Sequence, residues 1–324
     1  MGTYHLMGLG RSPGVVIGPI TYLARRYQRW GEDDQRFFAR SGETKQREAG
    51  EKVGDVQGIV LFTTREVLSG EVPAFDYVDN QPGRITKGPQ KPGGPMKEAL
   101  RTLLRREWPK ISGAQLEGSV FWCEVDRRNI RATYERVIRV VAALAEVGGQ
   151  GKEIWINLTG GNNVINFALE LAATISGQVA RLYYVQAENT AAERCVRFTA
   201  ENGYWVELPV LPLSLSRLSQ TTIRLLEKRG PLNLADLYSV LRNDYWDLSQ
   251  GLHSKEVLRD QHLKPLWKQG LIAEVNKAQY VVGPQWNLVR PYLDIWEEER
   301  QRATSLEDLA SRENWLKVEQ ILVT

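Results

Sequence analysis

The sequence has few of the residues on which metal sites, disulfide frameworks and histidine catalysis depend. It holds two cysteines and three histidines in 324 residues, and both cysteines lie in apolar segments without metal-binding spacing. No apolar run reaches the ~20 residues that span a bilayer, and the N-terminus lacks a signal-peptide core. We therefore expect a protein of the reducing cytoplasm, with no cofactor, no metal and no membrane partner.

The sequence also lacks a strong charge of either sign. Its 42 lysines and arginines nearly balance 39 aspartates and glutamates, which leaves a formal net charge of +3. Any surface that binds nucleic acid must therefore be local. The length allows two domains, and the 42% of apolar residues is typical of a globular protein.

Short apolar segments in the first two-thirds of the chain predict buried strands. They cover residues 4–10, 58–64, 119–125, 153–159 and 181–187. Helical patterns lie between them, most clearly over 130–147 and 163–176. This alternation predicts a parallel sheet with helices on both faces, and we assign it to a domain over residues 1–205.

A second pattern begins after a proline-rich connector over residues 206–217. Within residues 218–285, three helical segments are followed by Gly270 and then by two short apolar strands. This order is typical of a winged helix-turn-helix domain. Residues 286–324 predict a C-terminal helical tail. The expected fold class is α/β, a Rossmann-like parallel sheet followed by an α+β winged helix-turn-helix domain.

Two glycine-rich segments, GRSPG and TGGNN, follow the first and fourth predicted strands. Ligands bind outside the carboxyl ends of such strands, and glycines with helix amides favour anions there. The alternative is that TGGN is only a tight strand-to-helix turn capped by asparagine. The candidate ligand-binding residues are Gly10, Arg11, Ser12, Pro13, Gly14, Thr63, Thr64, Arg65, Asn157, Thr159, Gly160, Gly161, Asn162 and Asn163.

A dinucleotide site fits the first loop poorly. The fingerprint G-x-G-x-x-G matches Gly8 and Gly10, but Pro13 stands at its third glycine, and the acids from Glu32 to Asp34 lie in a polar stretch. Metal-dependent nuclease chemistry needs an acid with an E-x-K triple. Glu43-Thr44-Lys45 has that spacing, but it has no strand to hold it.

The order LGRSPGVV, LFTTREV, INLTGGNNVI, the LPVLPL connector and a winged helix resembles the CRISPR-associated Rossmann-fold (CARF) proteins over nearly the whole chain. The resemblance implies a homodimer that binds one cyclic oligoadenylate across its two-fold axis, with cyclic tetra-adenylate as the expected ring. This ligand is the second messenger of type III CRISPR antiviral defence. Asn163 departs from the family, which often has a lysine at this position.

Two functions follow from the resemblance. In the first, the chain senses cyclic oligoadenylate and regulates transcription by ligand-gated binding of double-stranded DNA. In the second, it is a metal-independent ring nuclease, and the candidate catalytic residues are Arg11, Ser12 and Thr159.

The third helix of the winged domain carries the candidate DNA contacts. An Arg-to-His ribonuclease motif is excluded there, because Arg259 and His262 are too close in sequence. The alternative is that this domain serves dimerisation. A further segment, 79–95, predicts a surface loop or a lid over an anion. The candidate nucleic-acid-binding residues are Lys255, Arg259, Gln261, His262, Lys264 and Lys268.

Overall fold

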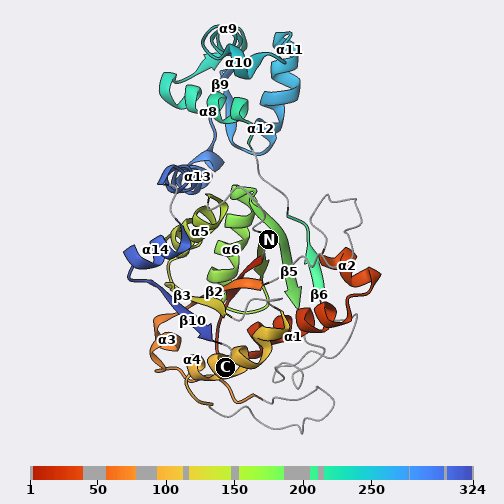
Figure 1. Ribbon diagram of the computed structural model, residues 1–324. Helices are drawn as coiled ribbons and strands as arrows, with labels where there is room; N and C mark the ends of the chain where they lie inside the picture. The colour runs from red at the N-terminus through yellow and green to blue at the C-terminus, as the bar shows by residue number, and fades with distance from the viewer. Residues whose placement is uncertain are drawn as a thin grey trace. The chain divides into compact units, whose positions relative to one another are not determined.

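The chain forms two compact units in a computed structural model (Figure 1). The first unit comprises Met1–Pro212 and Trp296–Thr324, and the second comprises Leu213–Ile295. The structure describes residues 3–38, 56–77, 93–111, 117–146, 153–185, 205–210, 215–276, 278–302 and 305–322. Most of the predicted 79–95 loop, Cys195 and Glu43-Thr44-Lys45 lie outside these ranges.

The first unit is built on a seven-stranded sheet in the order β10-β3-β2-β1-β4-β5-β6. Strands β1 to β5 pair in parallel with one another, whereas the edge strands β6 and β10 pair antiparallel with β5 and β3. The strands are β1 (Thr3–Gly8), β2 (Val56–Thr63), β3 (Glu117–Glu124), β4 (Glu153–Asn157), β5 (Val179–Val185), β6 (Trp205–Leu208) and β10 (Leu316–Leu322). The five predicted strands and their parallel arrangement are confirmed, and the order 3-2-1-4-5 is that of a Rossmann-like fold.

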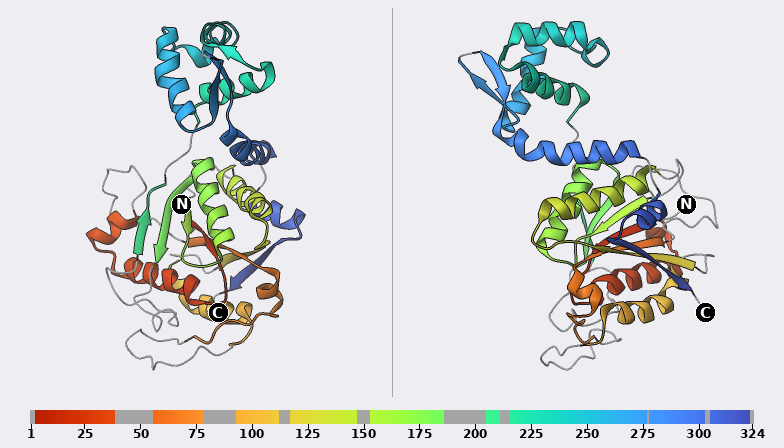
Figure 2. Two further views of the ribbon diagram at one scale, coloured as in Figure 1. Left: turned by 180° about the vertical axis from the view of Figure 1, so that it is seen from behind. Right: turned by 90° about the vertical axis from the view of Figure 1, so that its left-hand side faces the viewer.

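Helices cover both faces of this sheet. Helices α1 and α4 lie on one face, and α5, α6 and α14 lie on the other (Figure 2). The helices of this unit are α1 (Gly14–Arg29), α2 (Glu32–Phe38), α3 (Arg65–Ser69), α4 (Met96–Glu107), η2 (Trp108–Lys110), α5 (Ile130–Glu146), α6 (Asn163–Ser176) and α14 (Leu306–Arg312). The α1 and α4 face buries Met7, Leu61, Trp155 and Tyr183 from the strands in one core. The helices predicted over 130–147 and 163–176 are confirmed as α5 and α6.

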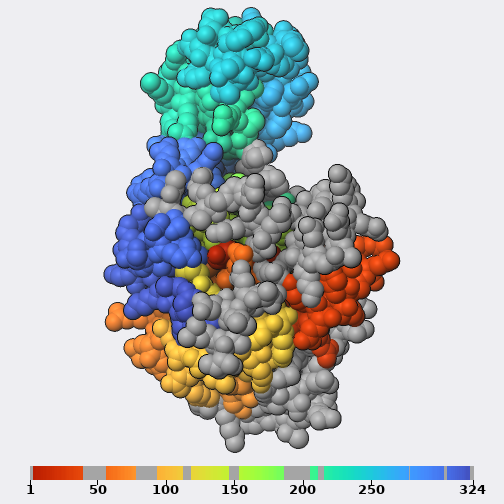
Figure 3. Space-filling view, in the orientation of Figure 1, coloured from red at the N-terminus to blue at the C-terminus, as the bar shows by residue number. Residues whose placement is uncertain are grey.

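The C-terminal segment differs from the predicted helical tail. It contains the helices Pro284–Arg302 and Leu306–Arg312, but Leu316–Leu322 forms β10, which pairs antiparallel with β3 from Leu316 opposite Cys123 to Leu322 opposite Glu117. Figure 3 shows this segment in blue at one side of the first unit, with α2 in red at the other. Leu316 and Ile321 are buried, so the end of the chain contributes to the core of the first unit.

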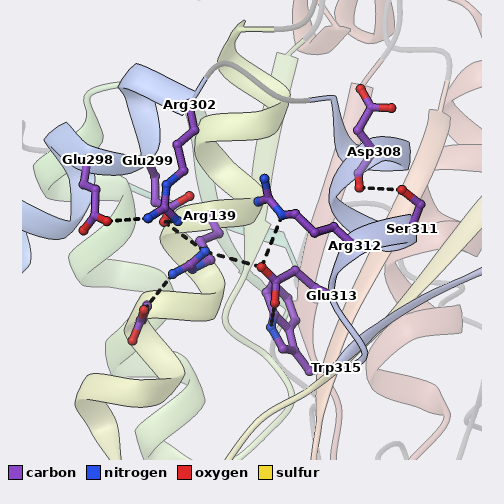
Figure 4. A network of polar contacts seen from close by, with 10 residues as sticks. Arg139, Glu298, Glu299, Arg302, Asp308, Ser311, Arg312, Glu313 and Trp315 are labelled. Carbon is purple, nitrogen blue, oxygen red and sulfur yellow. Dashed lines mark hydrogen bonds and ion pairs between the residues drawn. The ribbon is translucent and has the colours of Figure 1, made fainter.

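Ion pairs fasten the returning segment to α5 (Figure 4). Arg139 of α5 lies 2.9 Å from Glu135, 3.0 Å from Glu299 and 3.5 Å from Glu313. The Glu299 carboxylate, 2.7 Å from Arg302, is almost fully buried, and this burial raises its pKa. One carboxylate of the acidic run at residues 297–299 therefore forms a buried contact.

The second unit contains helices and a three-stranded sheet in the order β7-β9-β8. Helix α13 (Pro284–Arg302) begins in this unit and ends in the first. The helical and hairpin segments lie where the sequence predicts them, but the third helix is divided. The other elements are α8 (Arg217–Arg229), β7 (Leu232–Asn233), α9 (Leu234–Asp244), α10 (Trp246–Ser249), α11 (Lys255–Val257), η3 (Leu258–Leu263), α12 (Lys264–Lys268), β8 (Ile272–Val275) and β9 (Gln279–Val282).

Candidate functional site

The two glycine-rich loops meet at the carboxyl ends of β1 and β4, which are neighbours in the sheet. A Cβ atom added to Gly160 would lie 2.3 Å from the carbonyl oxygen of Gly8 and 2.5 Å from Val15 Cγ2, and one added to Gly8 would lie 2.6 Å from the Gly160 oxygen. Gly161 has a φ of +84°, which favours glycine. These glycines therefore allow backbone to pack on backbone, and they join the two loops into one surface.

Side chains at the end of β4 hold this surface together. Asn157 is fully buried; its Nδ2 donates to the Val15 oxygen at 3.0 Å, and its Oδ1 accepts from the Thr159 amide at 2.8 Å. The Thr159 hydroxyl accepts a hydrogen bond from the Val185 amide at 2.7 Å. The buried side chain of Asn157 therefore bonds the start of α1 to the loop after β4, and its role as a ligand contact stays a prediction.

The asparagines of the TGGNN loop differ in their surroundings. Asn162 caps α6, where its Oδ1 accepts from the Ile165 amide at 3.0 Å, as the turn-and-cap alternative predicts. Asn163 is exposed at the position where the resembling family often has a lysine. Asn166 donates to the Leu158 oxygen at 3.2 Å, while its buried Oδ1 has no hydrogen-bond partner among the described residues.

Arg11 is held in one orientation beside the loop. Its Nε donates to the Pro73 oxygen at 3.0 Å, its Cζ lies 4.1 Å from the centre of the Phe75 ring, and its carbonyl oxygen accepts from the Phe75 amide at 2.7 Å. The neighbouring Gly10 faces space, because no heavy atom of the described part of the chain lies within 4 Å of an added Cβ. A fixed cation therefore borders an open stretch of backbone.

The rest of the GRSPG loop leads into α1. Ser12 is half-buried, and Pro13 and Gly14 are buried. The carbonyl oxygen of Pro13 accepts hydrogen bonds from the Val16 and Ile17 amides, each at 3.1 Å, so the helix starts directly after the loop.

The three predicted ligand residues of the loop after β2 differ in their exposure. Thr63 is fully buried, and its hydroxyl has no hydrogen-bond partner within the described ranges. Thr64 precedes the five-residue helix α3, and Arg65 is exposed. Arg65 is therefore the side chain of this loop that solvent reaches most readily.

The sequence analysis missed the loop after β3. Arg127 and Arg128 are exposed there, Arg127 lies 3.9 Å from Glu66 at the start of α3, and the Arg128 amide donates to Asp126 Oδ1 at 2.9 Å. Since β3 is the neighbour of β2, these arginines lie at the same sheet edge as Arg65. The sequence signal that could have identified these arginines is DRRN, which directly follows a predicted strand of the parallel sheet.

One of the acids considered for a dinucleotide site, Asp34, has a structural role. Asp34 is buried and accepts hydrogen bonds from Arg26 at 2.9 Å and from two nitrogens of Arg29 at 2.7 Å, and these bonds lower its pKa. It is therefore engaged within the protein and cannot bind a ribose. In the described part of the chain, no group of three His, Cys, Asp or Glu side chains could hold a metal ion.

The candidate nucleic-acid contacts lie on α11, η3 and α12 of the second unit. Most of their side chains are exposed, whereas His262 is half-buried and its pKa is lowered by burial. Arg259 forms two hydrogen bonds with Asp260, at 3.0 and 2.9 Å. The exposed residues are Lys255, Arg259, Gln261, Lys264 and Lys268.

No protein-family profile matches the sequence. An uncharacterized protein of Archaeoglobus fulgidus is 26% identical over 259 residues, which cover 75% of this chain and 79% of that protein. Among solved structures, Enterococcus italicus Csm6 bound to cyclic hexa-2'-fluoro-hexa-dAMP matches with a TM-score of 0.37 and 9% identity.

That match covers 83% of this chain, and the chain spans about half (54%) of the length of Csm6. A likeness this remote assigns neither a fold nor a ligand to the chain. No helix within the described ranges is long and apolar enough to cross a bilayer.

Proposed function

We propose that the first unit binds a cyclic oligoadenylate at the edge formed by the β1 and β4 loops, and that the second unit binds double-stranded DNA. The chain would then be a ligand-gated transcriptional regulator of type III CRISPR defence. The contact between Gly8 and Gly160 is the observation that carries this proposal, because it joins two predicted loops into one surface at the switch point of the sheet.

The chemistry of this surface suits a ring of phosphates. The guanidinium of Arg11 is oriented by Pro73 and Phe75, which lowers the entropy cost of holding it against an anion. Gly10, where no described atom lies within 4 Å of an added Cβ, allows close approach to the backbone, and α1 and α6 begin at the two loops. A two-fold axis beside this edge would present each loop twice to a symmetric ring, which is why we propose a homodimer.

The second unit supports DNA binding by its order of elements. Helices α8, α9 and the α11–α12 segment precede the β8–β9 hairpin, and β7 adds a third strand, an arrangement typical of a winged helix. Exposed cations lie on the third helix of this order, where such domains contact DNA.

Ligand binding is tested by incubating the purified chain with cyclic tri-, tetra- or hexa-adenylate in metal-free buffer. We expect a rise in melting temperature with one ring, and about a tenfold or greater loss of affinity in Arg11→Ala, because a charge-assisted hydrogen bond is removed. Arg105→Ala is the matched control. Arg105 is exposed near the end of α4. Strand β3 follows α4 in the chain, so Arg105 lies toward the amino ends of the strands, opposite the carboxyl ends that carry the proposed ligand site.

Chromatography of the same mixtures distinguishes the two functions. An intact ring after incubation supports a sensor. A linear product would make the chain a ring nuclease, with Arg11, Ser12 and Thr159 as the candidate groups. If none of the three rings shifts the melting temperature, the proposed ligand is wrong.

A further inference from the structure

The third helical segment of the second unit contains a π-helical turn. Helix α11 continues into η3, which has π geometry over Leu258–Leu263, and then into α12. The Lys264 amide donates to the carbonyl oxygen of Arg259, five residues earlier. Such turns insert one residue into a helix and often occur at functional sites.

Two features of the sequence account for this turn. Leu258 and Leu263 are both fully buried, although five residues separate them and a regular α-helix would place them about 140° apart. Pro265 has no amide hydrogen, so the carbonyl of Gln261 lacks its usual donor four residues later. The π turn brings both leucines to the buried face.

The same turn realigns the basic side chains. Arg259 and Lys264 are also five residues apart, so the geometry that aligns the leucines aligns these cations. Lys255 lies one α-helical turn before Arg259, and Lys268 lies one turn after Lys264. We call these four exposed residues the basic stripe. Without the π turn, its two halves would point in different directions.

Contacts around the stripe support this alignment. Arg259 and Lys264 line the same hollow of about 370 Å³ between the helix and the β8–β9 hairpin. Trp267 lines it too, with 52% of its surface exposed, and Tyr280 of β9 forms the opposite wall. The hollow therefore combines two cations and a large exposed aromatic ring with the carboxylates of Asp260 and Glu274.

We propose that the basic stripe binds the phosphate backbone of double-stranded DNA, independent of base sequence, with Trp267 packed against the sugars of the contacted strand. The phosphates of a DNA strand form a regular series of charges, which a row of cations can contact. Bidentate recognition of a base instead needs a guanidinium whose donors are not engaged elsewhere. The fork of Arg259 is engaged by both oxygens of Asp260, which disfavours bidentate recognition of guanine. This inference rests on the proposed DNA binding of the second unit.

The test measures affinity against salt for the full chain and two duplexes of unrelated sequence, with and without cyclic tetra-adenylate. Lys264→Ala should weaken binding to both duplexes equally and reduce the slope of log K against log salt by about one. Lys228→Ala removes an exposed cation of α8 outside the hollow and should leave the slope unchanged. Asp260→Asn should tighten binding, because it removes a negative charge beside Arg259 and Lys264.

The outcomes separate this inference from the proposed function. If DNA binds but Lys264→Ala leaves the slope unchanged, or weakens one duplex only, the stripe is not a backbone contact although the unit still binds DNA. Tighter binding of the separated strands would show a single-strand site and also overturn the inference. If neither duplex binds in either condition, the DNA-binding function itself fails. Unchanged melting temperatures show that the variants fold.

Discussion

Gly160 and Gly10 lie in the two loops of the proposed ligand site, but a methyl group would meet different surroundings at each. The Cβ of an alanine at position 160 would overlap the backbone of Gly8, whereas the one at position 10 would meet no described atom within 4 Å. Substitutions at the two positions therefore distinguish an effect on packing between the loops from an effect on access of the ligand.

Gly160→Ala should destabilise the first unit by about 1–3 kcal/mol, because backbone atoms must move to admit the methyl group. Gly10→Ala should change stability by less than about 0.5 kcal/mol. Denaturant unfolding measures both. Equal stability of the two variants would contradict the close contact between the loops.

The burial of His5 predicts that the folded protein loses stability on mild acidification. It is fully buried in β1, where its Nδ1 is 3.0 Å from the Tyr183 hydroxyl, and burial, with the nearby charge of Arg181, lowers its pKa to about 3. Between pH 6.5 and this value the unfolded chain binds a proton that the folded chain does not, so stability falls as the pH falls.

Between pH 7 and pH 5 this effect should cost about 2 kcal/mol. His5→Asn should reduce the pH slope of unfolding free energy, while His253→Gln, which alters an exposed histidine, should not. A slope in His5→Asn equal to that of the wild type would show that His5 does not titrate in this way.

At this scale the sequence predicts which residues lie at the carboxyl ends of the strands, but it does not predict what each of their side chains contacts. The position of Asn157 was predictable, because it ends an apolar strand. Its role was not, because that depends on Val15, which packs beside it only in the folded chain. Arg127 and Arg128 were missed because their relation to Arg65 follows from the order of the strands.

At the scale of elements, β10 is the main departure from the predicted structure. The five parallel strands are short apolar runs and could be recognised. The segment LKVEQIL instead has polar residues at several exposed positions, because it forms the edge of the sheet. Its partner β3 lies far away in the sequence, so local pattern could not predict the pairing.

Ile321 and Val318 test whether β10 supports the core. Ile321 is 2% exposed and Val318 is 44% exposed in the same strand. Ile321→Ala should lower the unfolding free energy of the first unit by about 2–4 kcal/mol, and Val318→Ala by less than about 1 kcal/mol. Similar small losses in both variants would show that the strand is not part of the cooperative core.

The divided third helix also has a sequence explanation. The pattern predicts one continuous helix over 254–269, and the chain is helical through this range. Leu258 and Leu263 are five positions apart, an interval that does not match the 3.6-residue period of an α-helix. This interval, followed by Pro265, is the sequence signal for the π turn.

At the scale of the whole molecule, helix α13 connects the unit proposed to bind a cyclic oligoadenylate with the unit proposed to bind DNA. Helix α13 begins in the second unit and ends in the first, where Glu299 pairs with Arg139 of α5 and with Arg302 of its own helix. Since α5 begins directly after the loop that carries Arg127 and Arg128, the Arg139–Glu299 ion pair connects the helix that follows this loop with the helix that continues into the second unit.

The stoichiometry of ligand binding tests the central claim most directly. Titration calorimetry of the full chain with cyclic tetra-adenylate in metal-free buffer should saturate at one ring for two chains, because two copies of the β1 and β4 loops would surround one ring. The heat should be lost in Arg11→Ala and kept in Arg105→Ala. One ring per chain would contradict the two-fold site, and no heat with the tri-, tetra- or hexa-adenylate ring would contradict the proposed ligand.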